Sequence, residues 1–274
     1  MSTTSDSRER SAERAARIFG RVLVGVDGSE AGLEAARQAA RLAEGPLTLV
    51  SVVGTLPPAA AGPIGVGPVL YAEEDRSDEA EAALAEALQE VEDLHAAAGT
   101  VARGVPWDEL LNGAEAAGAT LVAVGSHGTG RRAGIVFGST ATAVIHKAKC
   151  SVLVARGTQP KEFPQRIVVG VDGSSESELA LEVARYVAAR HGASVWPLAA
   201  HGGDGIDRER VAELLGDRYE HAPDDPVHAL VAASAGSDLL VVGSRGLHGL
   251  KALGSVSERV AHRARCSVLV VRGL

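Results

Sequence analysis

The stretch "RVLVGVDGSEAGLEAARQAARLA" (residues 21–43) returns at residues 166–188 as "RIVVGVDGSSESELALEVARYVA". In both copies a short β-branched run is followed by a Gly-Ser pair and then by apolar residues at helical spacing. This order predicts a strand, a tight turn and a helix. Because each strand is continuously apolar and does not alternate, it indicates a parallel sheet that is covered by helices on both faces.

The repetition continues to the carboxyl end of each copy. The segment "LVAVGSHG" (121–128) corresponds to "LLVVGSRG" (239–246), and "GSTATAVIHKAKCSVLVAR" (138–156) corresponds to "GSVSERVAHRARCSVLVVR" (254–272). Fewer residues separate the matching ends in the second copy, so that copy has a shortened middle. Its beginning and its end are retained.

These matches predict two tandem domains. We expect the first at residues 20–156 and the second at residues 166–274, joined by a linker at 157–165 that carries two prolines and no apolar periodicity. Residues 1–19 are polar and charged, and we expect a disordered tail there.

Within the first copy, apolar runs alternate with segments of helical spacing. The expected strands are 22–26, 47–53, 100–104, 120–125 and 151–156, and the expected helices after the first are 78–99, 106–118 and 139–148. Residues 54–68 are too rich in Pro and Gly for a regular element. The predicted fold is therefore α/β, with two tandem doubly wound five-stranded parallel sheets of order 3-2-1-4-5 and helices on both faces.

Composition excludes several classes of protein. The formal net charge is -8, and no stripe of Lys and Arg is available for a nucleic-acid partner. No apolar stretch has the length of a signal peptide or a membrane span, so we expect a cytoplasmic protein with no membrane contact. Cys150 and Cys266 fall at one repeat position without metal-ligand spacing, so we expect buried thiols and no metal site.

The glycines of "GSHGTGRRAGIVFGST" (125–140) follow the fourth expected strand, and the pair "DG" (27–28) follows the first. In a 3-2-1-4-5 order these two strands are neighbours where the strand order reverses, which is where such sheets bind ligands. The loop leads into a helix whose free N–H groups suit phosphate, and Arg131 adds positive charge. A lone glycine loop is more often a tight turn, but this one recurs and faces an acidic residue. The P-loop and dinucleotide motifs are both absent.

The spacing Gly125, two residues, Gly128, nine residues, Gly138-Ser139 resembles the signature of the universal stress protein family in its ATP-binding branch. The segments "VGVDGS" and "CSVLVAR" are also typical of that family, and the resemblance covers both copies. It implies the five-stranded parallel sheet expected above, with adenosine between the first and second strands and phosphates in the glycine loop.

The resemblance implies an ATP site in the first copy. Asp27 would contact a ribose hydroxyl and Val52 would meet adenine through its backbone. The residues expected around the phosphates are Gly125, His127, Gly128, Arg131, Gly138, Ser139 and Thr140. The alternatives are that Asp27 only caps the following helix, that His127 only faces solvent, and that Ser139 caps its helix with or without ligand.

The second copy retains part of this set. The corresponding residues are Asp172, Gly243, Arg245, Gly246, Gly254, Ser255 and Ser257. Its glycine loop is two residues shorter than the family pattern, and Arg245 replaces the histidine. We therefore expect the first site to bind nucleotide more reliably than the second.

The predicted function is that of an ATP-binding universal stress protein, which acts in stress response through nucleotide-dependent conformation or partner docking. ATP is the expected cofactor, with Mg²⁺ or Mn²⁺ as an optional companion, and no residue is assigned a catalytic role. The alternatives are a slow ATPase or adenylate-handling enzyme, and a scaffold that binds no nucleotide. The last strands, 151–156 and 267–272, are expected to pair antiparallel within the chain, with two separate edges as the alternative. Whether two chains form a homodimer stays open.

Overall fold

The computed structural model describes residues 3–54, 76–128, 137–157, 162–200, 207–216, 219–222, 225–244 and 255–273, with the backbone alone at residues 3–8, 200, 220, 221 and 255. The first half of the chain contains α1 (Thr3–Ile18), β1 (Val22–Val26), α2 (Glu30–Leu42), β2 (Leu47–Gly54), α3 (Ser77–Val91), β3 (Ala97–Gly104), α4 (Pro106–Ala117), β4 (Leu121–Gly125), α5 (Ser139–Lys147) and β5 (Ser151–Ala155). The second half contains β6 (Arg166–Gly170), α6 (Ser175–His191), β7 (Ser194–Ala200), α7 (Arg208–Leu215), β8 (Glu220–Ala222), α8 (Pro226–Ser234), β9 (Leu239–Gly243), α9 (Ser255–Arg263) and β10 (Ser267–Val271).

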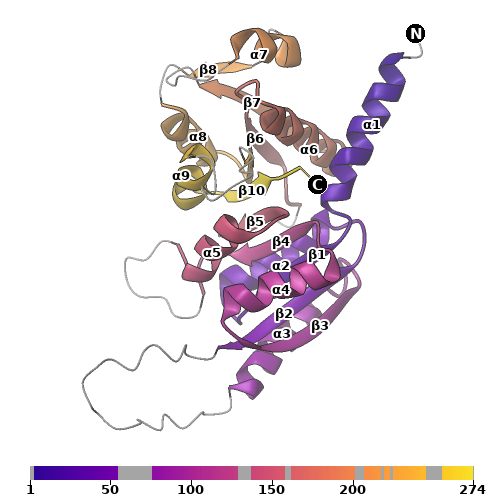
Figure 1. Ribbon diagram of the computed structural model, residues 1–274, viewed down its shortest axis with the longest axis vertical. Helices are drawn as coiled ribbons and strands as arrows, with labels where there is room; N and C mark the ends of the chain where they lie inside the picture. The colour runs from indigo at the N-terminus through magenta and orange to yellow at the C-terminus, as the bar shows by residue number, and fades with distance from the viewer. Residues whose placement is uncertain are drawn as a thin grey trace.

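The described strands form one sheet in the order β3-β2-β1-β4-β5-β10-β9-β6-β7-β8 (Figure 1). The prediction of an α/β fold with a mainly parallel sheet is confirmed, and each half has the order 3-2-1-4-5. The last strands of the two halves, β5 and β10, pair antiparallel as the sequence predicted, and this pairing makes the two five-stranded sheets continuous. In the described part of the chain this is the one antiparallel pair of the sheet.

Helices cover both faces of this sheet. One buried apolar cluster contains side chains of α1, α2, α3, α6 and α7, and the other contains side chains of α4, α5, α8 and α9. Each cluster continues across the β5–β10 pair, since Leu153 and Leu269 lie in the first and Val152 and Val268 in the second. The continuously apolar strands of the sequence are therefore buried from both sides, as parallel strands require.

The antiparallel pair is locked by reciprocal contacts between equivalent residues. The backbone amide of Arg156 donates to Oγ of Ser267, and that of Arg272 donates to Oγ of Ser151, both at 3.0 Å. The guanidinium of Arg156 donates to the carbonyls of Ala261 and Ala264, and that of Arg272 to those of Ile145 and Cys150. The two halves are thus related by an approximate twofold axis through this strand pair.

The expectation of a disordered tail at residues 1–19 is wrong for the residues of this segment that the structure describes. Residues 3–18 form α1, and Ala15, Ile18 and Phe19 are buried. The helix lies beside α6 of the other half (Figure 1), where Ser11 donates to Glu182 at 3.0 Å and the Phe19 ring stacks on Tyr186. The polar composition suggested a tail because the apolar residues of this segment are few and gathered in its last turn.

The helix expected over 78–99 is shorter in the structure. It ends at Val91, and residues 97–99 belong to β3. This strand pairs with β2 along its whole length, from Leu47↔Ala97 to Gly54↔Gly104. The ladder of backbone hydrogen bonds outweighs the helix propensity of the Ala-rich segment. The irregular stretch expected at 54–68 lies almost wholly outside the described residues.

The described carboxyl-terminal part of the expected linker (157–165) packs against the second half. The side chain of Phe163 is 2% exposed and belongs to the same apolar cluster as Ile167 of β6. None of the helices in the described part of the chain combines the length and the apolar character of a membrane span.

Cys150 and Cys266 are buried free thiols, as the sequence predicted. Burial raises the pKa of Cys266 to about 12, although the nearby charge of Arg156 acts in the opposite direction. Burial also raises the pKa of Cys150. Both thiols are therefore protonated at neutral pH, and a protonated thiol is a poor nucleophile.

We predict that iodoacetamide at about pH 8.5, near the ordinary pKa of a thiol, alkylates neither cysteine of the folded protein. Because the fold retains the Cys266 proton up to about pH 12, deprotonation favours unfolding, and the free energy of unfolding should fall as the pH rises from 8.5 towards that value. Mass spectrometry measures the alkylation, with denatured protein as the control in which both thiols react. Rapid modification of Cys266 in folded protein would contradict this burial.

We predict that Phe19→Ala lowers the free energy of unfolding by about 3–5 kcal/mol, because a fully buried aromatic ring leaves a cavity. Urea denaturation followed by circular dichroism measures this change. The matched control is Leu94→Ala, whose side chain is 38% exposed and should cost less than about 0.5 kcal/mol. Equal effects of the two substitutions would show that the Phe19 ring, directly after α1, is not packed in the core.

Candidate functional site

A cavity of about 370 Å³ opens at the carboxyl ends of β1 and β4. These strands are neighbours in the sheet, and the strand order reverses between them. Open α/β sheets bind ligands at this position, because the loops that follow the two strands leave in opposite directions.

The cavity wall contains every described residue that the sequence predicted for the first site: Asp27, Val52, Gly125, His127, Gly128, Gly138, Ser139 and Thr140. Arg131 lies outside the described residues. Sequence reasoning missed the remaining lining residues, which are Gly25, Val26, Val50, Pro106, Leu110, Val124 and Ala141. Gly25 and Val26 lie in the quoted segment "VGVDGS", which was the available signal for them. The others are apolar residues of strands and helices, and the signal available for them was their position in the predicted order of elements.

Asp27 directs the start of α2. Its Oδ1 accepts hydrogen bonds from the Ser29 amide at 3.1 Å and from the Ser29 hydroxyl at 2.5 Å. The Ser29 hydroxyl in turn accepts from the Gly32 amide at 3.1 Å, so Ser29 is the N-cap. The alternative that Asp27 caps this helix is therefore wrong. Its exposed side chain orients the cap and presents Oδ2 to the loop after β4.

The loop after β4 comes close to the Asp27 side chain at Gly128. A Cβ atom at this position would lie 2.3 Å from Oδ2 of Asp27, well inside contact distance. A methyl group at position 128 would therefore displace the Asp27 carboxylate from its place where the two loops face each other across the crevice. At Gly138 the nearest atom to such a Cβ is 3.4 Å away, which is an ordinary contact.

Gly125 is required for a different reason. A Cβ there would lie 2.6 Å from the carbonyl carbon of Ala31 in the first turn of α2. The equivalent Gly243 meets the carbonyl oxygen of Glu176 in α6 at 2.5 Å. Close packing of a helix on the end of a strand thus explains this glycine in both halves, without any ligand.

Helix α5 begins at the cavity wall without a side-chain cap. Gly138 is its N-cap in extended conformation, and no side chain of the described residues caps it. The prediction that Ser139 caps the helix is wrong, because Ser139 is the first helical residue. The Gly138 amide donates to the Ser126 carbonyl at 2.7 Å and closes the loop. The first-turn amides of Ser139, Thr140 and Ala141 have no partner within the helix and give this end a partial positive charge.

His127 completes the polar side of the cavity. Its Nδ1 lies 3.0 Å from Oγ of Ser126, and its carbonyl oxygen lies 3.4 Å from Oγ of Ser29. The imidazole is half-buried, so the alternative of a purely solvent-facing ring does not describe it. Among the lining residues, Asp27 and His127 carry the titratable side chains.

The opposite wall is apolar. Val50 and Val52 of β2 face Pro106 and Leu110 of α4 around the cavity. Val50 and Leu110 are buried, and Val52 is partly buried. The cavity therefore combines a carboxylate, an apolar wall and a helix N-terminus, which suits a ligand with a polar ring, a flat apolar part and an anionic group.

The second half repeats the hydrogen bonds that join Asp27, Ser29 and the start of the following helix. The Ser174 amide and hydroxyl donate to Oδ1 of Asp172 at 3.0 and 2.5 Å, and Ser174 caps α6 through the Ser177 amide. The backbone here is covered by the start of α7, since the Asp207 amide donates to the Asp172 carbonyl at 3.0 Å.

The structure describes only some of the remaining residues that were predicted for the second site. The Ser257 hydroxyl is buried and donates to the Gly243 carbonyl at 2.7 Å, so its proton is already used. Ser255 begins α9, and Arg245, Gly246 and Gly254 lie outside the described residues.

Comparison with known proteins agrees with this architecture. The family model described as "Universal stress protein family" matches residues 19–156 and 217–272. A universal stress protein of Mycolicibacterium smegmatis is 31% identical over 292 residues, covering 92% of this chain and 96% of that protein. One of Mycobacterium tuberculosis is 32% identical over 297 residues, with 92% and 96% covered.

A solved structure shows the same fold. The universal stress protein from Archaeoglobus fulgidus superposes with a TM-score of 0.70 at 23% sequence identity, over 93% of this chain and 97% of that one. Together with the family match over most of the sequence, this shows that the chain belongs to the universal stress protein family.

Proposed function

We propose that the first half binds an adenine nucleotide, ATP foremost, and that the protein acts in stress response through nucleotide-dependent conformation or partner docking. The observation that carries this proposal is the cavity at β1 and β4, which joins a carboxylate, an apolar wall and the uncapped start of α5. Its volume of about 370 Å³ lies within the range of about 300–1,000 Å³ that is usual for small-ligand sites.

Each part of the ligand has a chemical counterpart. Oδ2 of Asp27 accepts a hydrogen bond from a ribose hydroxyl, while Oδ1 stays engaged with Ser29. Adenine lies on the apolar wall beside the backbone of Val52. The phosphates meet the first-turn amides of α5 and the hydroxyls of Ser139 and Thr140, where the helix dipole favours negative charge.

The rest of the phosphate side of the cavity is formed by Gly125, His127, Gly128 and Gly138. Arg131 adds positive charge. Because Gly128 has no side chain, the loop can approach Asp27 closely. In this proposal Mg²⁺ or Mn²⁺ accompanies the phosphates as part of the ligand.

We expect binding without efficient hydrolysis. Efficient phosphoryl transfer needs groups that hold a metal ion and position water beside the γ-phosphate. The lining residues offer the side chain of His127 on that side, while the Asp27 carboxylate lies on the nucleoside side. Release of labelled phosphate within minutes in a single-turnover assay would instead favour a slow ATPase.

We propose that the second half binds nucleotide more weakly. The start of α7 covers the end of β6 there, and the Ser257 hydroxyl already donates to a carbonyl. The halves, 20–156 and 166–274, are proposed to be two domains that stay paired through β5 and β10 in solution.

We predict that Gly128→Ala weakens ATP binding by at least about tenfold, or about 1.4 kcal/mol, because its methyl group displaces Oδ2 of Asp27. The control, Gly236→Ala, should change the affinity by less than about threefold, since this glycine lies outside the cavity wall and its methyl group would meet no atom within 4 Å. Isothermal titration calorimetry measures both. If the wild-type protein binds no adenine nucleotide at all, the proposed function is wrong. If Gly128→Ala weakens binding no more than Gly236→Ala does, the assignment of the crevice to Asp27 and Gly128 is wrong.

We predict that Asp27→Asn weakens ATP binding by about 10- to 100-fold, the cost of losing a hydrogen bond to a charged acceptor. The amide retains an oxygen for Ser29, so the cap of α2 and the melting temperature should change little. The control is Asp172→Asn at the equivalent position of the second half, which should leave the main binding isotherm unchanged. Similar losses from both substitutions would show that the halves bind nucleotide equally.

A further inference from the structure

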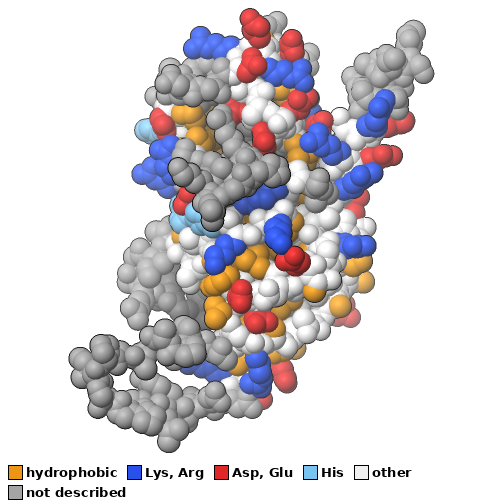
Figure 2. Space-filling model, in the orientation of Figure 1, with side chains coloured by type: hydrophobic (Ala, Val, Ile, Leu, Met, Phe, Trp, Pro, Cys, Tyr) orange, Lys and Arg blue, Asp and Glu red, His pale blue; other side chains and the backbone are white. Residues whose placement is uncertain are grey.

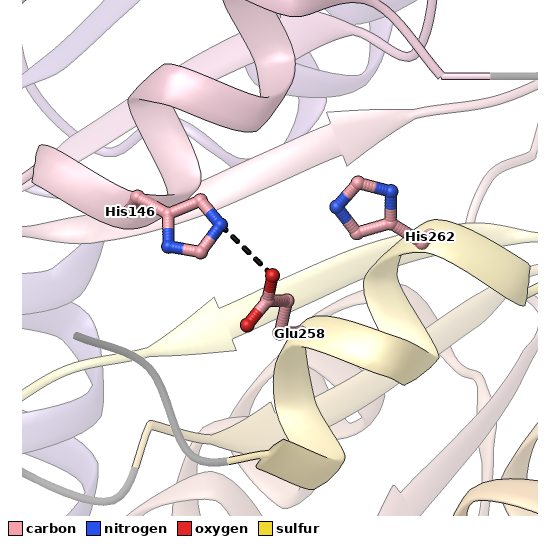
Figure 3. A group of neighbouring side chains, drawn as sticks. All are labelled: His146, Glu258 and His262. Atoms are coloured by element: carbon pink, nitrogen blue, oxygen red, sulfur yellow. Dashed lines mark ion pairs between the residues drawn. The ribbon is translucent and has the colours of Figure 1, made fainter. Parts of the chain in front are cut away.

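Three potential metal ligands meet where the two halves join. His146 of α5 faces Glu258 of α9, and His262 lies one turn further along α9 (Figure 3). The Nε2 atom of His146 is 3.0 Å from Oε1 of Glu258, and one ligand atom from each of the three residues lies within 4.8 Å of the other two. Nothing in the proposed nucleotide site uses these side chains.

The cluster follows from the internal symmetry of the chain. His146 and His262 are four residues before Cys150 and Cys266, so they occupy the same repeat position. The antiparallel pairing of β5 with β10 places the two equivalent helices, α5 and α9, on the same face of the sheet. The approximate twofold axis therefore brings one histidine from each half together, and Glu258 adds a carboxylate from one side.

We propose that His146, Glu258 and His262 bind a divalent transition metal ion, with Zn²⁺ as the first choice. Two imidazoles and one carboxylate form a ligand set that zinc accepts in proteins, with water at the fourth position. The same set disfavours Mg²⁺ and Ca²⁺, which prefer oxygen ligands throughout.

The geometry requires a small adjustment. Ligands at about 2.0–2.1 Å from a tetrahedral zinc ion are about 3.3 Å apart, close to the 3.0 Å between His146 and Glu258. The longest separation is at most 4.8 Å, so rotation of the His262 side chain must close a gap of at most about 1.5 Å. The ligands are half-exposed, with 29% of the His146 and 37% of the Glu258 side chain accessible, so an ion can reach them. Figure 2 shows histidine side chains at the surface where the halves meet.

The surroundings of His262 favour its role as a ligand. Its ring lies 4.2 Å from the ring of Phe137, centroid to centroid, and this contact holds the imidazole at the junction.

A metal ion at this position would link α5 of one half to α9 of the other. Its binding energy would be available only when the halves are joined as in the structure, so the ion should stabilise the paired state. This consequence does not depend on nucleotide binding.

The test uses the full-length protein after removal of metals with a chelator. Titration with Zn²⁺ against a chromogenic competitor should give one tight site per chain, and the melting temperature should rise with Zn²⁺. His146→Gln, Glu258→Gln and His262→Gln should each weaken binding by more than about tenfold, since even second-shell changes cost about 10- to 100-fold. The control, His228→Gln, removes an exposed histidine of α8 and should leave the affinity unchanged.

Substitution with Co²⁺ gives a second readout that does not depend on stability. A site with three protein ligands should show the visible absorption of four- or five-coordinate Co²⁺, and this band should disappear in His262→Gln. Excess Mg²⁺ should not compete. The proposal is overturned if the wild-type protein binds no stoichiometric Zn²⁺, or if the three substitutions weaken binding no more than the control.

Discussion

The antiparallel pairing of β5 with β10 is the contact on which the rest of the molecule depends. Each strand would otherwise be the exposed edge of a five-stranded sheet, with unpaired N–H and C=O groups open to other chains. Joining them makes both apolar clusters continuous across the molecule. The reciprocal hydrogen bonds of Arg156 and Arg272 lock the strand register, because each guanidinium binds one carbonyl in the last turn of a helix of the opposite half and one carbonyl that follows this helix.

This pairing places equivalent residues of the two halves against one another, and small differences between the copies then produce different chemistry. The histidines at one repeat position meet at the junction, but a carboxylate joins them from α9 alone, because Thr142 occupies the position equivalent to Glu258. The crevices diverge similarly. In the first half a cavity lies between β1 and β4, whereas in the second the shortened middle brings Asp207 onto the end of β6.

The glycines of the loop after β4 serve two physical purposes that the sequence does not separate. Gly125 allows α2 to pack on the end of β4, and its counterpart Gly243 does the same for α6. Gly128 instead allows the loop to approach the Asp27 carboxylate. The first purpose concerns stability in both halves, and the second shapes the proposed nucleotide site.

The sequence by itself determined the α/β class and most of the strands and helices, because hydrophobic period and turn residues are local properties of the chain. The sequence also led to the strand order within each half and to part of the first crevice, but through the doubly wound class and the resemblance to the universal stress protein family. It did not predict that residues 3–18 form a helix, nor that 97–99 extend a strand, since α6 and β2 supply the partners for these segments from far along the chain. It also did not predict the meeting of His146, Glu258 and His262. Ligands more than a hundred residues apart have no spacing motif, and only the tertiary packing of α5 beside α9 decides that they touch.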